Sequence, residues 1–180
     1  MAEGLTATSA ISENEGRVPS FSDVYSAYQK MVRGTLYRMC GPSYLDDLVQ
    51  DCFIRIWNGL PNFDRRSSLK TWIYPIVVRV GIDHLRGNKK RALLVPLENW
   101  TATTEGHQKD TENKDLVLRG LLSLPLEQRV VLVLAIYEGL SVQEISAVTD
   151  SKEGTVKSRI FYAKKGMVEF LKTNGVSDVD

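Results

Sequence analysis

Apolar residues recur at intervals of three and four along most of the chain, as one buried face of an α-helix requires. The first such pattern begins at Phe21, ends at Cys40-Gly41-Pro42, and has inward positions at Val24, Tyr28, Met31, Val32, Leu36 and Met39. The second runs from Tyr44 to Leu60 and turns inward Leu45, Leu48, Val49, Cys52, Phe53 and Ile56. These patterns predict two amphipathic helices.

A third helical pattern covers residues 69–86 and contains Pro75. Proline removes one backbone donor and crowds the carbonyl of Thr71, so we expect a kink or a late helix start. Helical patterns resume at residues 116–124 and 127–137, and the latter contains the apolar run VVLVLAIY. Because no stretch alternates apolar with polar residues, the chain predicts an all-α fold.

The stretch from Gly139 to Lys165 predicts two short helices joined by a tight turn. Ser141 is a favourable N-cap, and Glu144 completes a capping box. After the turn residues Asp150-Ser151-Lys152, a second helix buries one face, made of Val156, Ile160, Ala163 and Met167. Its other face is basic and polar, with Lys157, Ser158, Phe161, Tyr162, Lys164 and Lys165. This layout is typical of a DNA-reading helix-turn-helix.

Composition limits the class of protein. The apolar fraction of 43% allows a buried core, but no run approaches the roughly 20 apolar residues of a membrane span. The polar residues 1–20 lack a secretory signal and predict a disordered tail, and residues 173–180 predict a polar C-terminal tail. Cys40 and Cys52 lack metal-ligand spacing, which predicts reduced, buried thiols in a cytoplasmic protein with no metal and no cofactor.

The net charge of +1 is unevenly distributed. Residues 1–91 hold 13 basic and 9 acidic side chains, whereas residues 92–115 hold 2 and 5. A local basic excess is common on surfaces that bind phosphate. The acidic, apolar-poor residues 93–114 predict a flexible linker between two helical domains, residues 21–92 and residues 115–172.

The second domain resembles region 4 of the sigma factors of bacterial RNA polymerase. The resemblance rests on LLSLPLEQRVVLVLAIYEGLSVQEIS followed by EGTVKSRIFYAKK. Related helix-turn-helix regulators share part of this pattern, so a stand-alone regulator of duplex DNA remains the alternative at this point.

The first domain favours the sigma reading. DDLVQDCF, residues 46–53, resembles sigma region 2.2, and FDRRSSLKTWIY, residues 63–74, with IDHLR, residues 82–86, resembles regions 2.3 and 2.4. Both domains in this order, with only a short linker between them, are similar to extracytoplasmic-function (ECF) sigma factors. The resemblance implies a promoter-specificity subunit that is not an enzyme and is often controlled by an anti-sigma factor.

Three interpretations apply to the polar face of the second helix. In the simplest interpretation this is a solvated face, made of Asp46, Asp47, Gln50 and Asp51. The sigma resemblance implies docking on core polymerase, through the β′ coiled coil here and the β flap in the second domain. The third is a magnesium-dependent enzyme using Asp47 and Asp51, although the second carboxylate set and large apolar cavity of such enzymes are not visible.

Cations interleaved with aromatic residues suit single-stranded DNA, because cations follow phosphates and rings stack on bases. By resemblance, the residues that capture the −10 strand are Phe63, Asp64, Arg65, Arg66, Ser67, Ser68, Lys70, Trp72, Tyr74, Arg79 and Arg86. Trp72 and Tyr74 lie on different faces of a helix, so we expect one to contact DNA and the other to pack. Many relatives carry Asn at the position of Arg79, which predicts an atypical −10 sequence.

The candidate residues for the −35 duplex are Thr155, Lys157, Ser158, Arg159, Phe161, Tyr162, Lys164 and Lys165. Thr155, Lys164 and Lys165 suit phosphate contacts, which position the protein without specifying sequence. Relatives often carry Arg in place of Tyr162, so we expect the −35 preference to differ too. For Arg159, a second interpretation is an ion pair with Glu144 that braces the motif.

Overall fold

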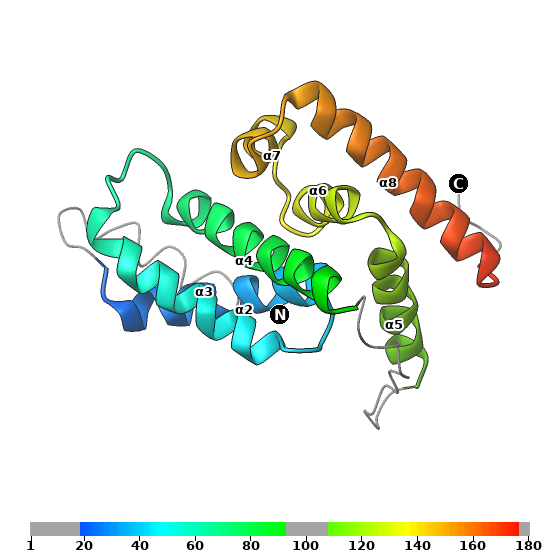
Figure 1. Ribbon diagram of the computed structural model, residues 1–180, viewed down its shortest axis with the longest axis horizontal. Helices are drawn as coiled ribbons and strands as arrows, with labels where there is room; N and C mark the ends of the chain where they lie inside the picture. Colours follow the sequence, from blue (N-terminus) through cyan, green and yellow to red (C-terminus); the bar gives the residue numbers. More distant parts are fainter. Residues whose placement is uncertain (1–18, 93–107, 177–180) are drawn as a thin grey trace, which may run out of the picture.

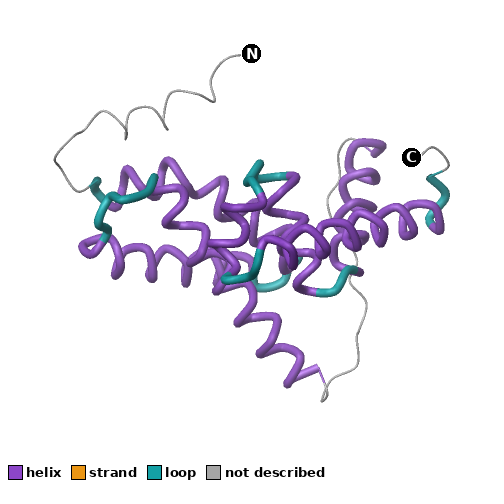
Figure 2. Tube along the Cα trace, turned by 90° about the horizontal axis from the view of Figure 1, so that it is seen from above, coloured by secondary structure: helices purple, strands orange, loops and turns teal. Residues whose placement is uncertain are grey.

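The computed structural model describes residues 19–92 and 108–176, and every regular element in these ranges is a helix (Figures 1 and 2). The elements are α2 (Phe21–Cys40), α3 (Leu45–Gly59), the 3₁₀ turn η1 (Leu60–Asn62), α4 (Leu69–Ala92), α5 (Gln108–Ser123), α6 (Leu126–Ile136), α7 (Val142–Thr149) and α8 (Glu153–Thr173). The all-α prediction is confirmed. In the described ranges, no helix has both the length and the apolar character that crossing a bilayer requires.

Helices α2, α3 and α4 pack on one another as a bundle around the apolar faces that their spacing predicts. Val24, Val32, Cys52, Ile56 and Ile73 at its centre are wholly buried. Helix α2 begins where the Ser20 hydroxyl accepts the Asp23 amide hydrogen. It ends at Gly41, whose φ of 81° lies in the left-handed region that glycine adopts without strain.

Helix α4 is continuous through Pro75 and begins at Leu69, so the expectation of a late helix start is wrong. The Ser68 hydroxyl caps the helix by accepting the Thr71 amide hydrogen at 3.1 Å. Pro75 itself is exposed, whereas its neighbours Tyr74 and Val77 are buried. Burial of the apolar face therefore outweighs the one backbone hydrogen bond that the proline removes.

The second half consists of α5 to α8, with α6 in the middle of the molecule (Figure 1). Five consecutive residues of α6, Val130–Leu134, are buried, because α8 packs on one side of this helix and α2 on another. The apolar run in the sequence thus belongs to a helix that is covered by both halves. Helix α5 begins at Gln108, earlier than the pattern from Leu116 predicts.

The two halves are packed against each other. Met39, Tyr74 and Val78 of the first half belong to the same apolar cluster as Val131 and Ile145 of the second. α2 lies beside α5 and α6, and α4 lies beside α7. The placement of the halves, which the sequence leaves open, is a closed one.

Candidate nucleic-acid interface

The loop between η1 and α4 presents a compact group of charged and polar side chains. Asp64, Arg65, Arg66, Ser67 and Ser68 are all exposed. Asp64 shapes the loop, because its carboxylate accepts the Arg66 amide hydrogen at 3.1 Å and lies 3.2 Å from the Arg66 Nε. Arg65 has a positive φ of 60°, which turns the chain sharply within this loop. The loop therefore offers two guanidinium groups to solvent on a defined backbone.

The aromatic residues around this loop differ in exposure. Phe63 and Trp72 are half-buried, with ring centroids 5.4 Å apart, and the Trp72 ring also packs closely on Gly59. A Cβ atom at Gly59 would lie only 2.9 Å from Trp72 Cζ2, so the glycine makes room for the indole. The partly exposed Phe63 and Trp72 rings remain available to stack on a base.

Tyr74 lies elsewhere. Its side chain is 2% exposed, and its hydroxyl donates to Glu138 of the second half at 3.0 Å. Burial, reinforced by the Glu138 carboxylate, raises the pKa of Tyr74. In this closed arrangement Tyr74 packs between the halves, so it is not exposed with the other residues expected to contact DNA.

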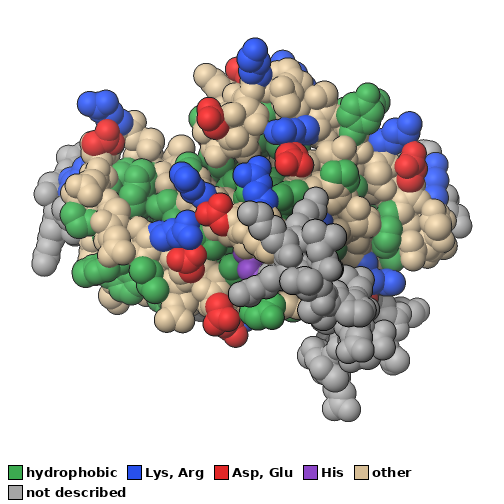
Figure 3. Space-filling model, viewed as in Figure 1, with side chains coloured by type: hydrophobic (Ala, Val, Ile, Leu, Met, Phe, Trp, Pro, Cys, Tyr) green, Lys and Arg blue, Asp and Glu red, His purple; other side chains and the backbone are tan. Residues whose placement is uncertain are grey.

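The exposed side of α4 continues the basic surface. Lys70, Arg79 and Arg86 are exposed on this helix. Asp83, also exposed, lies 3.5 Å from Arg55 of α3. Figure 3 shows basic and acidic side chains interspersed over this face of the molecule rather than one continuous basic patch. Phosphate contacts by α4 therefore depend on single cations.

The helix-turn-helix forms as the sequence predicts. The Ser141 hydroxyl accepts the Glu144 amide hydrogen at 3.2 Å, and the Ser141 amide donates to Glu144 Oε2 at 2.7 Å, which completes the capping box. Asp150 then adopts the left-handed conformation, with φ 48°, and separates α7 from α8. Val156 and Ala163 are buried, so the opposite face of α8 points to solvent.

That outward face carries the predicted reading residues. Phe161 and Tyr162 are 63% and 56% exposed, and their rings meet edge to face at 5.4 Å. The other exposed side chains on this face are Thr155, Lys157, Ser158, Lys164 and Lys165. A helix with two exposed rings flanked by lysines can contact thymine methyl groups and phosphates of a duplex.

Arg159 is half-buried and donates to the Ser151 hydroxyl at 3.0 Å. Ser151 belongs to the turn, and its carbonyl accepts a hydrogen bond from Ser146 of α7 at 2.6 Å. Arg159 therefore braces the motif through the turn, whereas Glu144, its expected partner, is engaged in the capping box.

The acidic side chains at the start of α3 have unequal surroundings. Asp46 forms an ion pair with Arg33 of α2. Asp51 accepts two hydrogen bonds from Arg55, at 2.9 and 3.1 Å, and Arg55 also pairs with Asp83. Asp47 is exposed and has no ion-pair or hydrogen-bond partner in the part of the chain that the structure describes. Since Arg55 already neutralises Asp51, Asp47 and Asp51 are not arranged as a pair of metal ligands.

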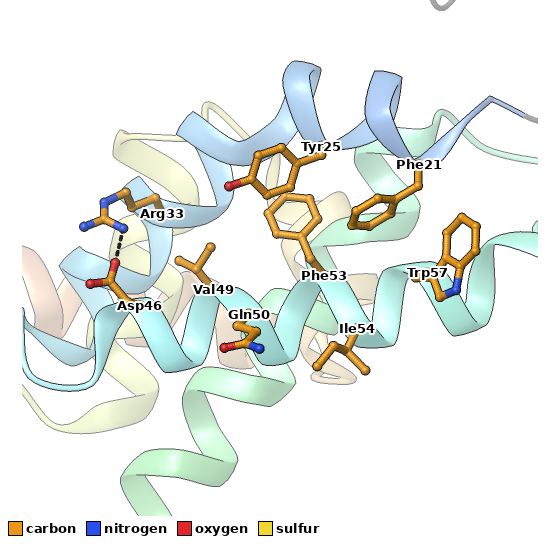
Figure 4. A pocket seen from close by; sticks show the side chains of 9 residues that line it. All are labelled: Phe21, Tyr25, Arg33, Asp46, Val49, Gln50, Phe53, Ile54 and Trp57. Atoms are coloured by element: carbon orange, nitrogen blue, oxygen red, sulfur yellow. Dashed lines mark hydrogen bonds and ion pairs between the residues drawn. The ribbon is translucent and has the colours of Figure 1, made fainter.

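Two apolar grooves were not expected from the sequence. The first lies between α2 and α3, beside Asp46 and Gln50, with Tyr25, Ile54 and Trp57 exposed along it (Figure 4). The second is formed by α5, α6 and α8, where Ile136 and Tyr137 are exposed. Apolar residues beyond one face of a helix, such as Ile54, Trp57 and Ile136, were the available signal.

Comparisons with known proteins match both halves. Residues 24–91 match the family Sigma-70 region 2, and residues 114–167 match Sigma-70, region 4. The ECF RNA polymerase sigma-E factor of Haemophilus influenzae is 30% identical over 94% of this chain and 96% of its own length. That of Escherichia coli K12 is 28% identical over 85% of this chain and 87% of its own. The chain belongs to the ECF sigma factors.

Two solved structures have the same fold as this sigma factor. The sigma factor RpoE from Bartonella quintana, in complex with the anti-sigma factor NepR, matches with a TM-score of 0.71 and 22% identity over 84% of this chain and 96% of that one. CnrH, in complex with the cytosolic domain of CnrY, matches with a TM-score of 0.66 and 21% identity over 97% and 100%.

The cysteines of the sigma factor are structural. Burial raises the pKa of Cys40 and of Cys52 to about 12, and neither forms a disulfide. Both thiols therefore stay protonated near neutral pH; Cys52 is buried as expected, whereas Cys40 is only partly buried.

Proposed function

We propose that this ECF sigma factor directs core RNA polymerase to promoters by reading the −35 duplex with α8 and holding the melted −10 strand with the loop before α4. The observation that carries the proposal is the exposure of both surfaces, one on the loop before α4 and one on α8. In the first half, exposed Arg65 and Arg66 lie in the same loop region as the partly exposed rings of Phe63 and Trp72. In the second half, α8 exposes Phe161, Tyr162, Lys164 and Lys165.

The loop residues suit strand capture. Taking a base out of a duplex costs a few kcal/mol of free energy. Stacking of the base on Phe63 or Trp72, together with polymerase binding, offsets this cost. Arg65, Arg66, Lys70, Arg79 and Arg86 supply phosphate contacts. These steps are binding and positioning, with no covalent chemistry, so we propose that the sigma factor acts without being an enzyme.

Polymerase docking is assigned to the start of α3. Asp47 and Gln50 are exposed without the ion pairs that engage Asp46 and Asp51, so they are the groups freest to meet basic side chains of the β′ coiled coil. The second half is assigned to the β flap. Such docking places the protein in the cytoplasm with the polymerase.

Anti-sigma control is part of the proposal. It is supported by the fold, which this chain shares with a sigma factor solved in complex with an anti-sigma factor. A partner of that kind would regulate the protein by covering the surfaces that bind polymerase and promoter.

The substitution Asp47→Lys tests the proposal against a stand-alone regulator. We expect it to weaken binding to core polymerase on the order of tenfold and to lower promoter output, while duplex binding by the isolated protein stays unchanged. The matched control is Glu127→Lys, the same charge reversal at an exposed position of α6. Unchanged polymerase binding and output in the Asp47 variant would contradict the proposal.

A further inference from the structure

One carboxylate joins the two halves of the sigma factor. Glu138 follows α6, and its Oε1 lies 2.8 Å from the Thr35 hydroxyl of α2, while its Oε2 accepts from the Tyr74 hydroxyl of α4 at 3.0 Å. Thr35 is wholly buried and Tyr74 nearly so. We call these three residues the Glu138 contact. It connects three helices, and its partners are as far as 103 residues apart in sequence.

Further interactions surround the Glu138 contact. Arg129 of α6 donates to the Met39 carbonyl at the end of α2, at 2.7 Å. The guanidinium of Arg38 lies over the Tyr137 ring, 4.2 Å from its centroid. Met39 and Val78 are almost completely buried beneath the second half. The interface thus combines apolar burial with hydrogen bonds, and Thr35 within it is wholly buried.

The covered surface belongs to α4, the helix that follows the strand-capturing loop. α7 packs on α4 and covers the side that bears Tyr74 and Val78. Glu144, at the start of α7, has a lowered pKa, mainly because Ser141 donates to it and to a smaller extent because Lys70 of α4 is near. Because α7 packs on α4, the exposed Glu144 carboxylate at the start of α7 opposes a phosphate chain that approaches the covered side of α4.

We propose that the Glu138 contact holds the free sigma factor in a closed, partly self-masked state. The side of α4 with Lys70, Arg79 and Arg86 stays exposed, whereas the side with Tyr74 and Val78 becomes available to a DNA strand only when this contact opens. The role of the α4 face rests on the proposed function, whereas closure itself does not. A DNA strand then competes with the second half for this side of α4. The apparent affinity of the protein for the strand falls in proportion to the fraction of molecules that are open.

Fluorescence transfer between the halves tests closure. Cysteines introduced at the exposed positions Ser26 of α2 and Lys172 of α8 would carry the dyes, because the raised pKa of Cys40 and of Cys52 disfavours their labelling. We expect Glu138→Ala to raise the ratio of open to closed molecules about tenfold, since the buried Tyr74 hydroxyl loses its charged acceptor and the Thr35 hydroxyl keeps only the Met31 carbonyl.

Tyr74→Phe removes one hydroxyl and keeps the ring, so it tests the contact without emptying the core. We expect it to raise the same ratio by a smaller factor, of a few-fold. Glu127→Gln, on the exposed side of α6, is the control and should leave transfer unchanged. Unchanged transfer in both test variants, with wild-type circular dichroism, would overturn closure and leave the proposed function standing.

Binding of a labelled random-sequence pool of single-stranded oligonucleotides tests the masking. If α4 is masked, Glu138→Ala tightens binding by about the factor by which the open fraction rises, and Glu127→Gln does not. If the halves open but oligonucleotide binding is not tighter, the masking is overturned. That result would also count against α4 as the surface that binds the strand, which is the part of the proposed function on which the masking rests.

Discussion

At the scale of single residues, a few partly buried polar groups matter more than the exposed ion pairs. Arg129 donates to the carbonyls of Met39, Leu122 and Leu124, all within 3.0 Å. Burial lowers the pKa of Arg129, and its hydrogen-bond partners among the described residues are backbone carbonyl groups rather than carboxylates. By contrast, Lys165 and Glu169 form an exposed pair at 4.0 Å, which is worth little.

Substituting Arg129 with Ala tests this contrast. The change leaves three carbonyl groups without their charged donor, so we expect a loss of about 3 kcal/mol in the free energy of unfolding, measured in urea. Arg119→Ala is the control, because Arg119 is exposed and pairs with the partly buried Asp115 one helical turn away, and its loss should cost about 0.5 kcal/mol or less. Equal losses in the two variants would contradict the role of Arg129.

Glu144 gives stability a pH dependence. Its pKa is lowered from the usual 4.5 by the Ser141 hydrogen bonds, so the folded state favours the carboxylate. The stabilisation is fully present above the pKa of the unfolded chain and is lost as pH falls through the folded value. We therefore expect Glu144→Gln to be less stable than wild type at neutral pH, with the difference closing below about pH 4.5. Urea titrations across pH measure this, and a constant difference would refute it.

At the scale of elements, apolar periodicity predicted most helices and their buried faces. Val156, which the pattern turned inward, is buried, and Tyr162, which it turned outward, is exposed. Two features escaped prediction, the continuity of α4 through Pro75 and the start of α5 at Gln108. In α4, burial of the apolar face outweighs the local effect of the proline.

The salt dependence of duplex binding tests which side chains of α8 contact phosphates and which contact bases. We expect Lys164→Ala to weaken −35 duplex binding similarly for all sequences, and to reduce the slope of log affinity against log salt by about 0.9, for one lost phosphate contact. Lys172→Ala, exposed at the far end of α8, is the control and should leave the slope unchanged. A changed sequence preference with an unchanged slope would instead make Lys164 a base-reading residue.

At the scale of the whole molecule, the sequence predicted two helical halves but not how they meet. Periodicity shows which face of α4 is apolar, and it cannot show that α7 covers Tyr74 on that face. The contact depends on Glu138, a polar residue that no local pattern distinguishes from a solvated one. The exposed candidates on α8 and in the loop were predictable, because outward position follows from the same spacing that identifies the core.

The most direct test of the account is transcription with purified components. The sigma factor would be added to bacterial core RNA polymerase on a library of genomic fragments, and the new transcript starts would be sequenced. We predict specific transcript starts that share two upstream elements. We expect the −10 element to be atypical, because Arg79 occupies a position where many relatives carry Asn. Failure of the folded protein to bind core polymerase, with no specific starts, would contradict the account and favour a stand-alone regulator.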